Sequence, residues 1–342
     1  MSDTKTAAQK YKNRKRTAII VFSIVMVLIV GVGAFAVKFL SDLGNTMNKV
    51  YQDVDTIDMR NSDVPDEDES GETIDGKKAS ENSKTTAQDL VNGAKPMAIL
   101  LIGADTGDLG RTATNGLSDT LIYCVLNPKN QKLTMLSIPR DTLTEIVGKG
   151  ITTKINAAYS YGGATMCINT VQNLLGLPID AYAAVNFYGF EQIIDAIGRI
   201  TVENEFAFSQ DEFFYPEGTI TLNGMEALDY CRMRYSDPEG DFGRARRQRQ
   251  VVGIAAKKIM SMSGALNYNE LLEAIGDNLL TNVSMDMSLK MMYQYGSCLN
   301  NIDSMDTLKG TSSTENGWVY ILDQQNLAEV TAHLREELEL DQ

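Results

Sequence analysis

The feature that most constrains this chain is an uncharged apolar run over residues 18–37, AIIVFSIVMVLIVGVGAFAV. Twenty helical residues rising 1.5 Å each span roughly 30 Å, which is the thickness of the bilayer core. Lysines and arginines precede the run, and the positive-inside rule therefore places residues 1–17 in the cytoplasm. We predict a single N-terminal transmembrane helix over 18–37, anchored in the cell membrane, with the rest of the chain outside the cell.

A cleaved signal peptide is the alternative, because Ala34-Phe35-Ala36 resembles a small-x-small cleavage site. The apolar core of a signal peptide usually has about 7–15 residues, and this run is longer, which favours an uncleaved anchor. The membrane also explains the basic N-terminus as a topology signal. No nucleic-acid partner is therefore predicted.

Composition changes after the apolar run. Acidic residues dominate from Asp53 to Asp75, where Arg60 is the only basic residue, and polar residues continue to Gly93. Such a stretch buries too little apolar surface to offset its conformational entropy. We predict an acidic extracellular linker over 38–95, helical at its start and extended beyond, followed by a compact domain over 96–342.

The histidine and cysteine counts exclude several kinds of chemistry. The chain has one histidine, His333, so a multi-histidine zinc site is impossible. Its four cysteines are far apart and form no CxxC pair, which argues against thiolate metal sites and redox motifs. Any bound metal should therefore have oxygen ligands, which favours Mg²⁺, Mn²⁺ or Ca²⁺.

Apolar patterns in the predicted domain alternate between strand and helix. Such alternation is typical of an α/β fold built around a central sheet. From residue 223 onward the pattern is mainly helical, and it closes with a strand and a last helix. The predicted strands cover 97–103, 121–127, 132–138, 181–187, 199–203 and 319–322, and the predicted helices cover 164–175, 190–197, 241–257 and a segment from 324.

Six arginines are concentrated in a short segment of this acidic chain. Arginine presents a planar fork that matches phosphate oxygens and stays charged at biological pH. Near the N-terminus of a helix, the helix dipole adds to the attraction for an anion. The alternative is that Arg244 and Arg247 simply pair with Asp237, Glu239 and Asp241. The six are Arg232, Arg234, Arg244, Arg246, Arg247 and Arg249.

Helical phase separates the arginines that follow Asp241, which we predict to begin the helix. At 100° per residue, Arg244, Arg247 and Gln248 share a face with the apolar stripe that continues to Ile259. Arg246 and Arg249 fall on the opposite face and are predicted to be solvated. The face that carries Arg244, Arg247 and Gln248 therefore predicts an anion site that is buried or lines a cleft.

Two aspartates flank the loop that follows the first predicted strand. Asp105 comes directly after the strand, and Asp119 comes directly before the next one. Ligands of open α/β sheets bind beyond the carboxyl ends of strands, where two carboxylates can hold a divalent cation together with water and phosphate. The alternative is ordinary turn chemistry, since Asp, Asn, Thr and Gly are the residues that turns use.

Several of these segments together resemble the LytR-CpsA-Psr family of cell-envelope proteins. The matching motifs are LLIGADTG, GRT, LSDT, SIPRDT, KINAAYSYGG, the stretch over 222–252 (LNGMEALDYCRMRYSDPEGDFGRARRQRQVV) and TNVSMD. The chain departs from the pattern at Leu117, where many members carry an arginine before Ser-Asp-Thr. The resemblance covers residue 96 to the C-terminus.

This resemblance implies an extracytoplasmic phosphotransferase with a three-layer α-β-α sandwich fold. Members are thought to move an anionic glycopolymer, such as wall teichoic acid or capsular polysaccharide, from a polyprenyl-pyrophosphate carrier to peptidoglycan. The lipid tail would lie in an apolar tunnel. The methionine-rich run that begins at Met285 could line that tunnel, although a core helix is the simpler interpretation.

The resemblance also implies roles for individual residues. Asp105 and Asp119 would hold Mg²⁺ or Mn²⁺ on the pyrophosphate. Arg111, Asp141 and Lys154 are candidates for substrate binding, Arg111 as a replacement for the arginine missing at Leu117. The predicted catalytic residues, which hold or orient the phosphate groups, are Arg140, Arg232, Arg234, Asp241, Arg244, Arg247 and Gln248.

Three other functions remain open from the sequence. The same site could hydrolyse a polyprenyl pyrophosphate, with water replacing the acceptor. The chain could be a lectin-like binding module if its carboxylates are structural. It could also be a transcriptional attenuator, although residues 1–17 are too few for a cytoplasmic effector domain, which usually needs about 40 residues or more.

Overall fold

The structure is a computed structural model that describes residues 38, 40–60, 86–106, 116–261, 268–305, 307–314 and 317–340. The chain divides into two compact units, Met1–Thr46 and Met47–Gln342. The predicted membrane span over 18–37 lies outside the described residues. Among the described residues, no helix is both long enough and apolar enough to cross a membrane.

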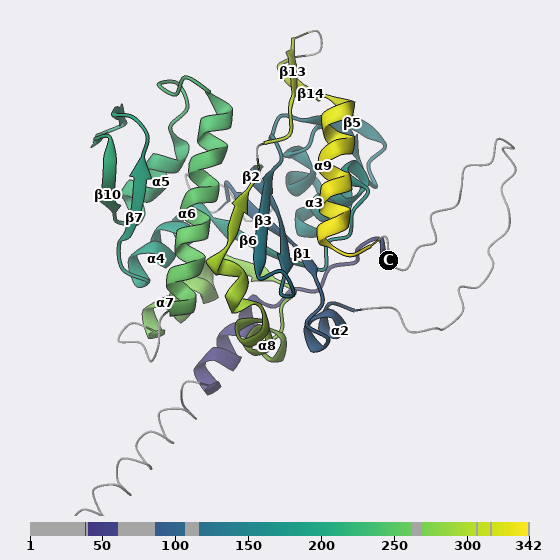
Figure 1. Ribbon diagram of the computed structural model, residues 1–342, viewed down its shortest axis with the longest axis vertical. Coiled ribbons are helices and arrows are strands. Elements are labelled where there is room, and N and C mark those ends of the chain that lie inside the picture. Colours follow the sequence, from purple (N-terminus) through teal and green to yellow (C-terminus); the bar gives the residue numbers. More distant parts are fainter. Residues whose placement is uncertain are drawn as a thin grey trace, which may run out of the picture. The chain divides into compact units, whose positions relative to one another are not determined.

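The second unit is a mixed α/β domain with a central six-stranded sheet (Figure 1). The strand order is β11-β6-β1-β2-β3-β12. The central strand β1 runs antiparallel to β2 and parallel to β6, and β2 runs antiparallel to β3. The short outer strands β11 and β12 pair with β6 and β3. Their bounds are β1 Met97–Ala104, β2 Ser118–Asn127, β3 Lys132–Ser137, β6 Ala181–Asn186, β11 Leu279–Thr281 and β12 Ile302–Ser304.

Helices flank both faces of this sheet (Figure 1). Strand residues alternate between the faces, so Leu100 and Tyr123 join one apolar core with α3 and α9, while Ile122 and Met135 join another with α2 and α8. A third core lies between α4, α5, α6 and the strands around β7. The bounds are α2 Ala87–Asn92, α3 Ala157–Leu175, α4 Phe187–Ala196, α5 Gly224–Arg232, α6 Asp241–Ser261, α7 Tyr268–Asn278, α8 Met285–Tyr295, η1 Gly296–Asn300 and α9 Gln324–Glu337.

In the part of the domain that the structure describes, four two-stranded sheets accompany the central sheet: β4–β5, β7–β10, β8–β9 and β13–β14. The prediction of a strand at 199–203 is confirmed, but this strand pairs with β10 rather than joining the central sheet. The predicted pairing of 121–127 with 132–138 is confirmed. The bounds are β4 Leu143–Ile146, β5 Ile151–Lys154, β7 Ile200–Asn204, β8 Phe208–Gln210, β9 Phe213–Tyr215, β10 Gly218–Leu222, β13 Gly310–Ser313 and β14 Val319–Leu322.

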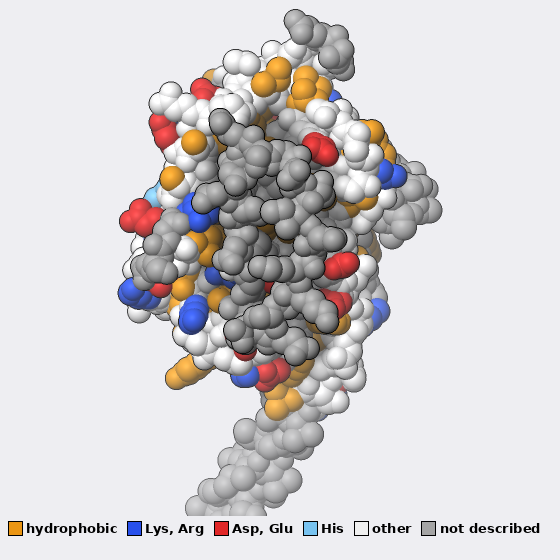
Figure 2. Space-filling model, turned by 90° about the vertical axis from the view of Figure 1, so that its right-hand side faces the viewer, with side chains coloured by type: hydrophobic (Ala, Val, Ile, Leu, Met, Phe, Trp, Pro, Cys, Tyr) orange, Lys and Arg blue, Asp and Glu red, His pale blue; other side chains and the backbone are white. Residues whose placement is uncertain are grey.

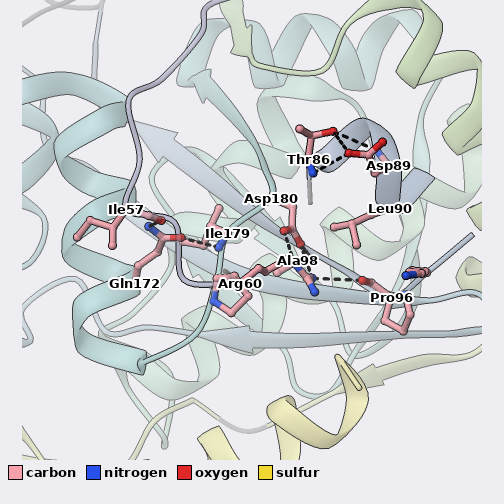
Figure 3. A network of polar contacts seen from close by, with 12 residues as sticks. Ile57, Arg60, Thr86, Asp89, Leu90, Pro96, Ala98, Gln172, Ile179 and Asp180 are labelled. Carbon is pink, nitrogen blue, oxygen red and sulfur yellow. Dashed lines mark hydrogen bonds and ion pairs between the residues drawn. The ribbon is translucent and has the colours of Figure 1, made fainter. Parts of the chain in front are cut away.

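Part of the predicted linker packs against the domain instead of extending into solvent. Arg60 donates to both carboxylate oxygens of Asp180 at 2.5 and 2.7 Å, and the two side chains are 11% and 6% exposed (Figure 3). Asp180 also accepts from the backbone N–H of Ala98 at 2.7 Å, in the first residues of β1. The backbone of Ile57 bonds to Asn169 on α3. The buried ion pair between Arg60 and Asp180, together with the hydrogen bond between Ile57 and Asn169, fixes residues 51–60 to the domain.

The four cysteines are all buried and unpaired. They lie in different parts of the fold: Cys124 on β2, Cys167 on α3, Cys231 on α5 and Cys298 in η1. On the face shown in Figure 2, acidic and basic side chains of the described residues are interspersed. Three of the clustered arginines, Arg244, Arg247 and Arg249 on α6, are buried.

Candidate active site

The sheet topology brings separate sequence motifs to one edge. Because β1 and β2 are antiparallel, with Ala104 opposite Ser118, Asp105 and Asp119 emerge together at the end of β1. The chain leaves β3 at the same edge, where the N–H of Ile138 donates to Leu121, and continues to Arg140. The parallel neighbour β6 also ends at this edge and leads directly into α4.

A cavity of about 520 Å³ opens at this edge, between the sheet and helices α4, α5 and α6. Seven of the polar residues singled out in the sequence line it. Its apolar wall includes Phe187, Phe190 and Ile193 of α4, which sequence reasoning did not identify as site residues. Their apolar helical spacing directly after a strand was the available signal. The seven polar residues are Asp105, Asp119, Arg140, Arg232, Arg234, Arg244 and Gln248.

The cavity is charged at one end and apolar at the other. Along β1 its lining runs from Asp105 back to Leu101, roughly 13 Å at 3.3 Å per residue. Along α6 the lining runs from Arg244 to Val252, roughly 12 Å at 1.5 Å per residue. On both elements the side chains change from charged to apolar in the same direction, away from the strand ends. The cavity therefore suits a molecule with an anionic head and a hydrocarbon tail.

Arg140 pairs with Asp119 and lies near Asp141. Its Nη1 lies 2.9 Å from Asp119 Oδ1, and its Nε lies 3.9 Å from Asp141 Oδ2. Burial opposes the charge on Arg140, but Asp119 and Asp141 outweigh burial and raise its pKa. Asp141 in turn pairs with Lys154 Nζ at 2.7 Å. Asp141 and Lys154 do not line the cavity, so the structure places them behind Arg140 as its support.

Arg244 carries a buried charge that its neighbours satisfy only in part. Its side chain is 11% exposed, and its Nη2 lies 2.8 Å from Asp241 Oδ1. Its Nε is buried without a hydrogen-bond partner in the described part of the chain. Burial lowers the pKa of Arg244, and the nearby charges of Arg140 and Arg234 lower it further. A buried donor without a partner costs free energy, which an anion bound at this point would offset.

The remaining polar residues surround this guanidinium. Arg234 Nε lies 3.3 Å from Asp241 Oδ1, so one carboxylate stands between two arginines. Arg232 lies 5.7 Å from the ring centre of Phe187, a cation–π contact on the cavity wall. Gln248 donates to the carbonyl of Cys231 at 3.5 Å, which ties α6 to α5. Among the described residues that line the cavity, arginines outnumber carboxylates by four to two.

Arg247 does not line the cavity, although its helical phase grouped it with Arg244. It is 5% exposed and its Nε donates to the carbonyl of Tyr230 at 3.1 Å. Its Nη atoms bond to the Asp237 carboxylate and the Met233 carbonyl. The neighbouring Gly243 passes so close that an added Cβ would lie 1.8 Å from Asp237 Oδ2. Arg247 therefore holds the α5–α6 connection, which carries Arg234.

The prediction that Arg249 is solvated is wrong. It is 3% exposed, and it donates to Ser304 and Ser137 at 2.7 Å and to Thr307 at 3.2 Å. These partners come from β3 and from a segment around β12. Both pack against the side of α6 that helical phase predicted to face solvent. Arg246 is partly exposed, and it pairs with Glu205 at 2.6 Å and with Glu239.

Three other features singled out in the sequence are Arg111, the methionine-rich run and the single histidine. Arg111 lies outside the described residues. The methionine-rich run forms α8, where Met287 is buried in the core beside the sheet and Met292 is exposed. None of the methionines of α8 is among the described residues that line the cavity. His333 lies on α9 and pairs with Glu337 at 3.9 Å, away from the cavity lining.

The carboxylates of the cavity match the donors that Mg²⁺ uses with phosphate ligands. Asp105 and Asp119 are the two carboxylates in its lining, and one or two carboxylates commonly hold Mg²⁺ when water and phosphate complete the shell. Across the described ranges, no group of three or more His, Cys, Asp or Glu residues could hold a metal by itself. A metal at this point would therefore depend on oxygen atoms from the bound ligand.

Together, the fold and the cavity define an α/β domain whose cavity suits an amphiphilic anion. The model of the LytR_cpsA_psr family matches residues 65–336. A teichoic acid transferase of Enterococcus faecalis, named polyisoprenyl-teichoic acid–peptidoglycan teichoic acid transferase TagU, is 36% identical over 95% of this chain and 98% of its own length. This chain therefore belongs to the LytR_cpsA_psr family.

Solved structures of relatives share the fold. The crystal structure of Bacillus subtilis TagU superposes with a TM-score of 0.59 at 38% identity, covering 71% of this chain and 97% of that one. A structure of TagT bound to LI-WTA superposes with a TM-score of 0.60 at 28% identity, covering 72% of this chain and 92% of that one. The prediction of family membership is confirmed.

Proposed function

We propose that this protein is a phosphotransferase that transfers an anionic glycopolymer, such as wall teichoic acid, from a polyprenyl-pyrophosphate carrier to peptidoglycan. The polarity of the cavity carries the proposal, because its arginine end suits a pyrophosphate and its apolar end suits a polyprenyl chain. The printed names of the relatives, which specify a polyisoprenyl-linked teichoic acid and peptidoglycan, support the same reaction.

In this reaction an acceptor hydroxyl of peptidoglycan attacks the phosphorus that carries the glycopolymer. A new P–O bond forms, the P–O bond to the polyprenyl phosphate breaks, and the hydroxyl releases its proton. Phosphoryl transfer depends mainly on positioning and on neutralising charge. Arg244, with its unsatisfied Nε, and Arg140 and Arg234 would hold the phosphate oxygens. Asp241 would orient two of these guanidiniums.

The test is to incubate the purified full-length protein with a lipid-pyrophosphate sugar, with and without peptidoglycan fragments. A phosphate-linked product that forms only with the acceptor would support transfer. Release of free sugar phosphate regardless of acceptor would instead indicate a hydrolase. Absence of turnover, with binding retained, would indicate a binding module or an envelope-linked regulator.

A divalent cation is part of the proposal. Asp105 and Asp119 would hold Mg²⁺ or Mn²⁺, which would supply charge neutralisation at the pyrophosphate when bound. Replacing Asp119 with asparagine keeps the side-chain shape and removes one charge. We expect Mg²⁺ to raise the melting temperature of the parent more than that of Asp119→Asn, because a bound ion at a hundredfold excess over its Kd adds about 2.7 kcal/mol to the free energy of unfolding.

The comparison uses thermal unfolding of the full-length protein with and without Mg²⁺. Asp105→Asn serves as the second variant, and Asp286→Asn, on the exposed face of α8, serves as the control that keeps the parental response. Equal Mg²⁺ responses in the parent and in both cavity variants would remove the metal assignment.

We also propose that the domain is a three-layer α-β-α sandwich that stands outside the cell behind an anchor over 18–37. The family match supports a location in the cell envelope, and the basic residues before the apolar run support this orientation. Protease added to intact cells or protoplasts should then digest the domain and leave a short N-terminal fragment. A C-terminal domain that resists digestion until the cells are lysed would contradict the topology.

A further inference from the structure

An open groove adjoins the charged end of the cavity. It has a volume of about 640 Å³, and Arg234 and Tyr235 line both the groove and the cavity. Its other lining residues come from the turn before α6, which includes Pro238 and Glu239, and from Trp318 in front of β14. A molecule in this groove would therefore lie next to the arginine that faces the phosphate end.

Two aromatic side chains of the groove are exposed to a degree that is unusual for their type. Tyr235 is 95% exposed and Trp318 is 48% exposed. Arg234 lies 6.0 Å from the ring centre of Tyr235, which links this ring to the cavity wall. Exposed aromatic side chains beside a polar site are typical of surfaces that bind a ligand with both apolar and polar faces.

The position of Trp318 is fixed by the residues that follow it. The N–H of Tyr320 donates to the carbonyl of Asp141 at 2.8 Å, directly after Arg140. The ring of Tyr320 packs against Phe242 in the first turn of α6, with ring centres 6.3 Å apart. Trp318 is therefore attached to the two segments that also carry Arg140 and Arg244.

We propose that this groove binds the saccharide of the acceptor, with Trp318 and Tyr235 packing on the apolar faces of its sugar rings. A pyranose ring has such a C–H face, while its hydroxyls need polar partners, which Arg234 and Glu239 provide. The pyrophosphate and lipid of the donor are assigned to the cavity, which leaves the adjoining groove open to the acceptor. The proposal rests on the proposed transferase function and adds the place where the acceptor binds.

The chain contains a single tryptophan, so intrinsic tryptophan fluorescence reports on Trp318 alone. The experiment titrates the full-length protein in detergent with soluble peptidoglycan glycan strands stripped of peptide. We expect a saturable change in emission. In calorimetry, Trp318→Ala and Tyr235→Ala should each raise the Kd for the glycan roughly tenfold, and Trp318→Phe should raise it less because a ring remains.

Tyr293→Ala is the matched control, because this tyrosine is 90% exposed on α8 and lines neither the groove nor the cavity. Its Kd for the glycan should equal the parental value. Unchanged glycan binding in both Trp318→Ala and Tyr235→Ala would overturn the proposal, as would binding of the free stem peptide in place of the glycan.

A second titration, with a short-chain polyprenyl pyrophosphate, separates the two proposals. If the parent binds the pyrophosphate and not the glycan, the groove proposal fails and the transferase proposal stands. If the parent binds the glycan through Trp318 and does not bind the pyrophosphate, the groove is a saccharide site and the transferase proposal fails.

Discussion

Arg244→Lys is expected to lower the rate of glycopolymer transfer by roughly 10- to 150-fold, because a charge-assisted hydrogen bond that acts in the transition state contributes about 1.5–3 kcal/mol. Lysine keeps the positive charge but lacks the planar fork and the Nε donor. That Nε is buried and has no hydrogen-bond partner in the described structure, so it is a donor available to a phosphate oxygen in the cavity. The measurement is the initial rate of transfer from a lipid-pyrophosphate sugar.

Arg246→Lys provides the control for this experiment. It makes the same chemical change two residues away on α6, where the side chain is 36% exposed and pairs with two surface glutamates. We expect near-parental rates, because lysine can keep a surface pair that contributes little to stability. If both variants lose activity equally while remaining folded, the arginines act as a diffuse basic patch and the pocket interpretation fails.

Asp180→Ala is expected to lower the free energy of unfolding by about 3–5 kcal/mol, since it leaves a buried arginine without its counter-charge. The Asp180 carboxylate accepts from Arg60 through both oxygens and also from the N–H of Ala98 (Figure 3). Burial opposes the charge of Arg60, and Asp180 outweighs this effect and raises the pKa. Denaturant unfolding followed by circular dichroism measures the loss.

Two further variants test the cause of this destabilisation. Asp286→Ala removes an exposed partner of Lys290 one helical turn away, and it should cost only about 0.3–0.5 kcal/mol. The double variant Arg60→Met with Asp180→Leu should recover most of the stability, because a buried ion pair can be replaced by apolar side chains. A double variant no more stable than Asp180→Ala would contradict the ion-pair explanation.

The strands of the central sheet could be predicted wherever they are continuous apolar runs. Residues 97–103 and 121–127 form strands because both faces of the sheet are covered, which makes nearly every position apolar. The edge strands β11 and β12 have three residues each and no such pattern, so sequence reasoning missed them. Along the strand predicted at 199–203, buried residues alternate with exposed ones. This alternation reflects its place in a half-exposed two-stranded sheet.

The sequence allowed most residues of the candidate site to be predicted, but not which of the arginines on α6 line the cavity. Asp105 and Arg140 follow strands and Asp119 lies at the start of β2, and antiparallel pairing brings such residues to one edge. Helical phase could not distinguish Arg244 from Arg247, because the partners of Arg247 lie on α5 and in the α5–α6 turn and not on α6. The burial of Arg249 depends on Ser304, which is distant in sequence and reaches α6 only through the folding of the chain.

The four buried cysteines bear on how this protein can be studied with chemical probes. Burial raises the pKa of Cys124, Cys167 and Cys231 to about 12, and that of Cys298 to about 11. Because the thiolate is the reactive form, burial and the raised pKa together keep the native thiols unreactive at neutral pH. A cysteine introduced beside the groove would therefore take a fluorophore or spin label selectively, in the otherwise unaltered chain.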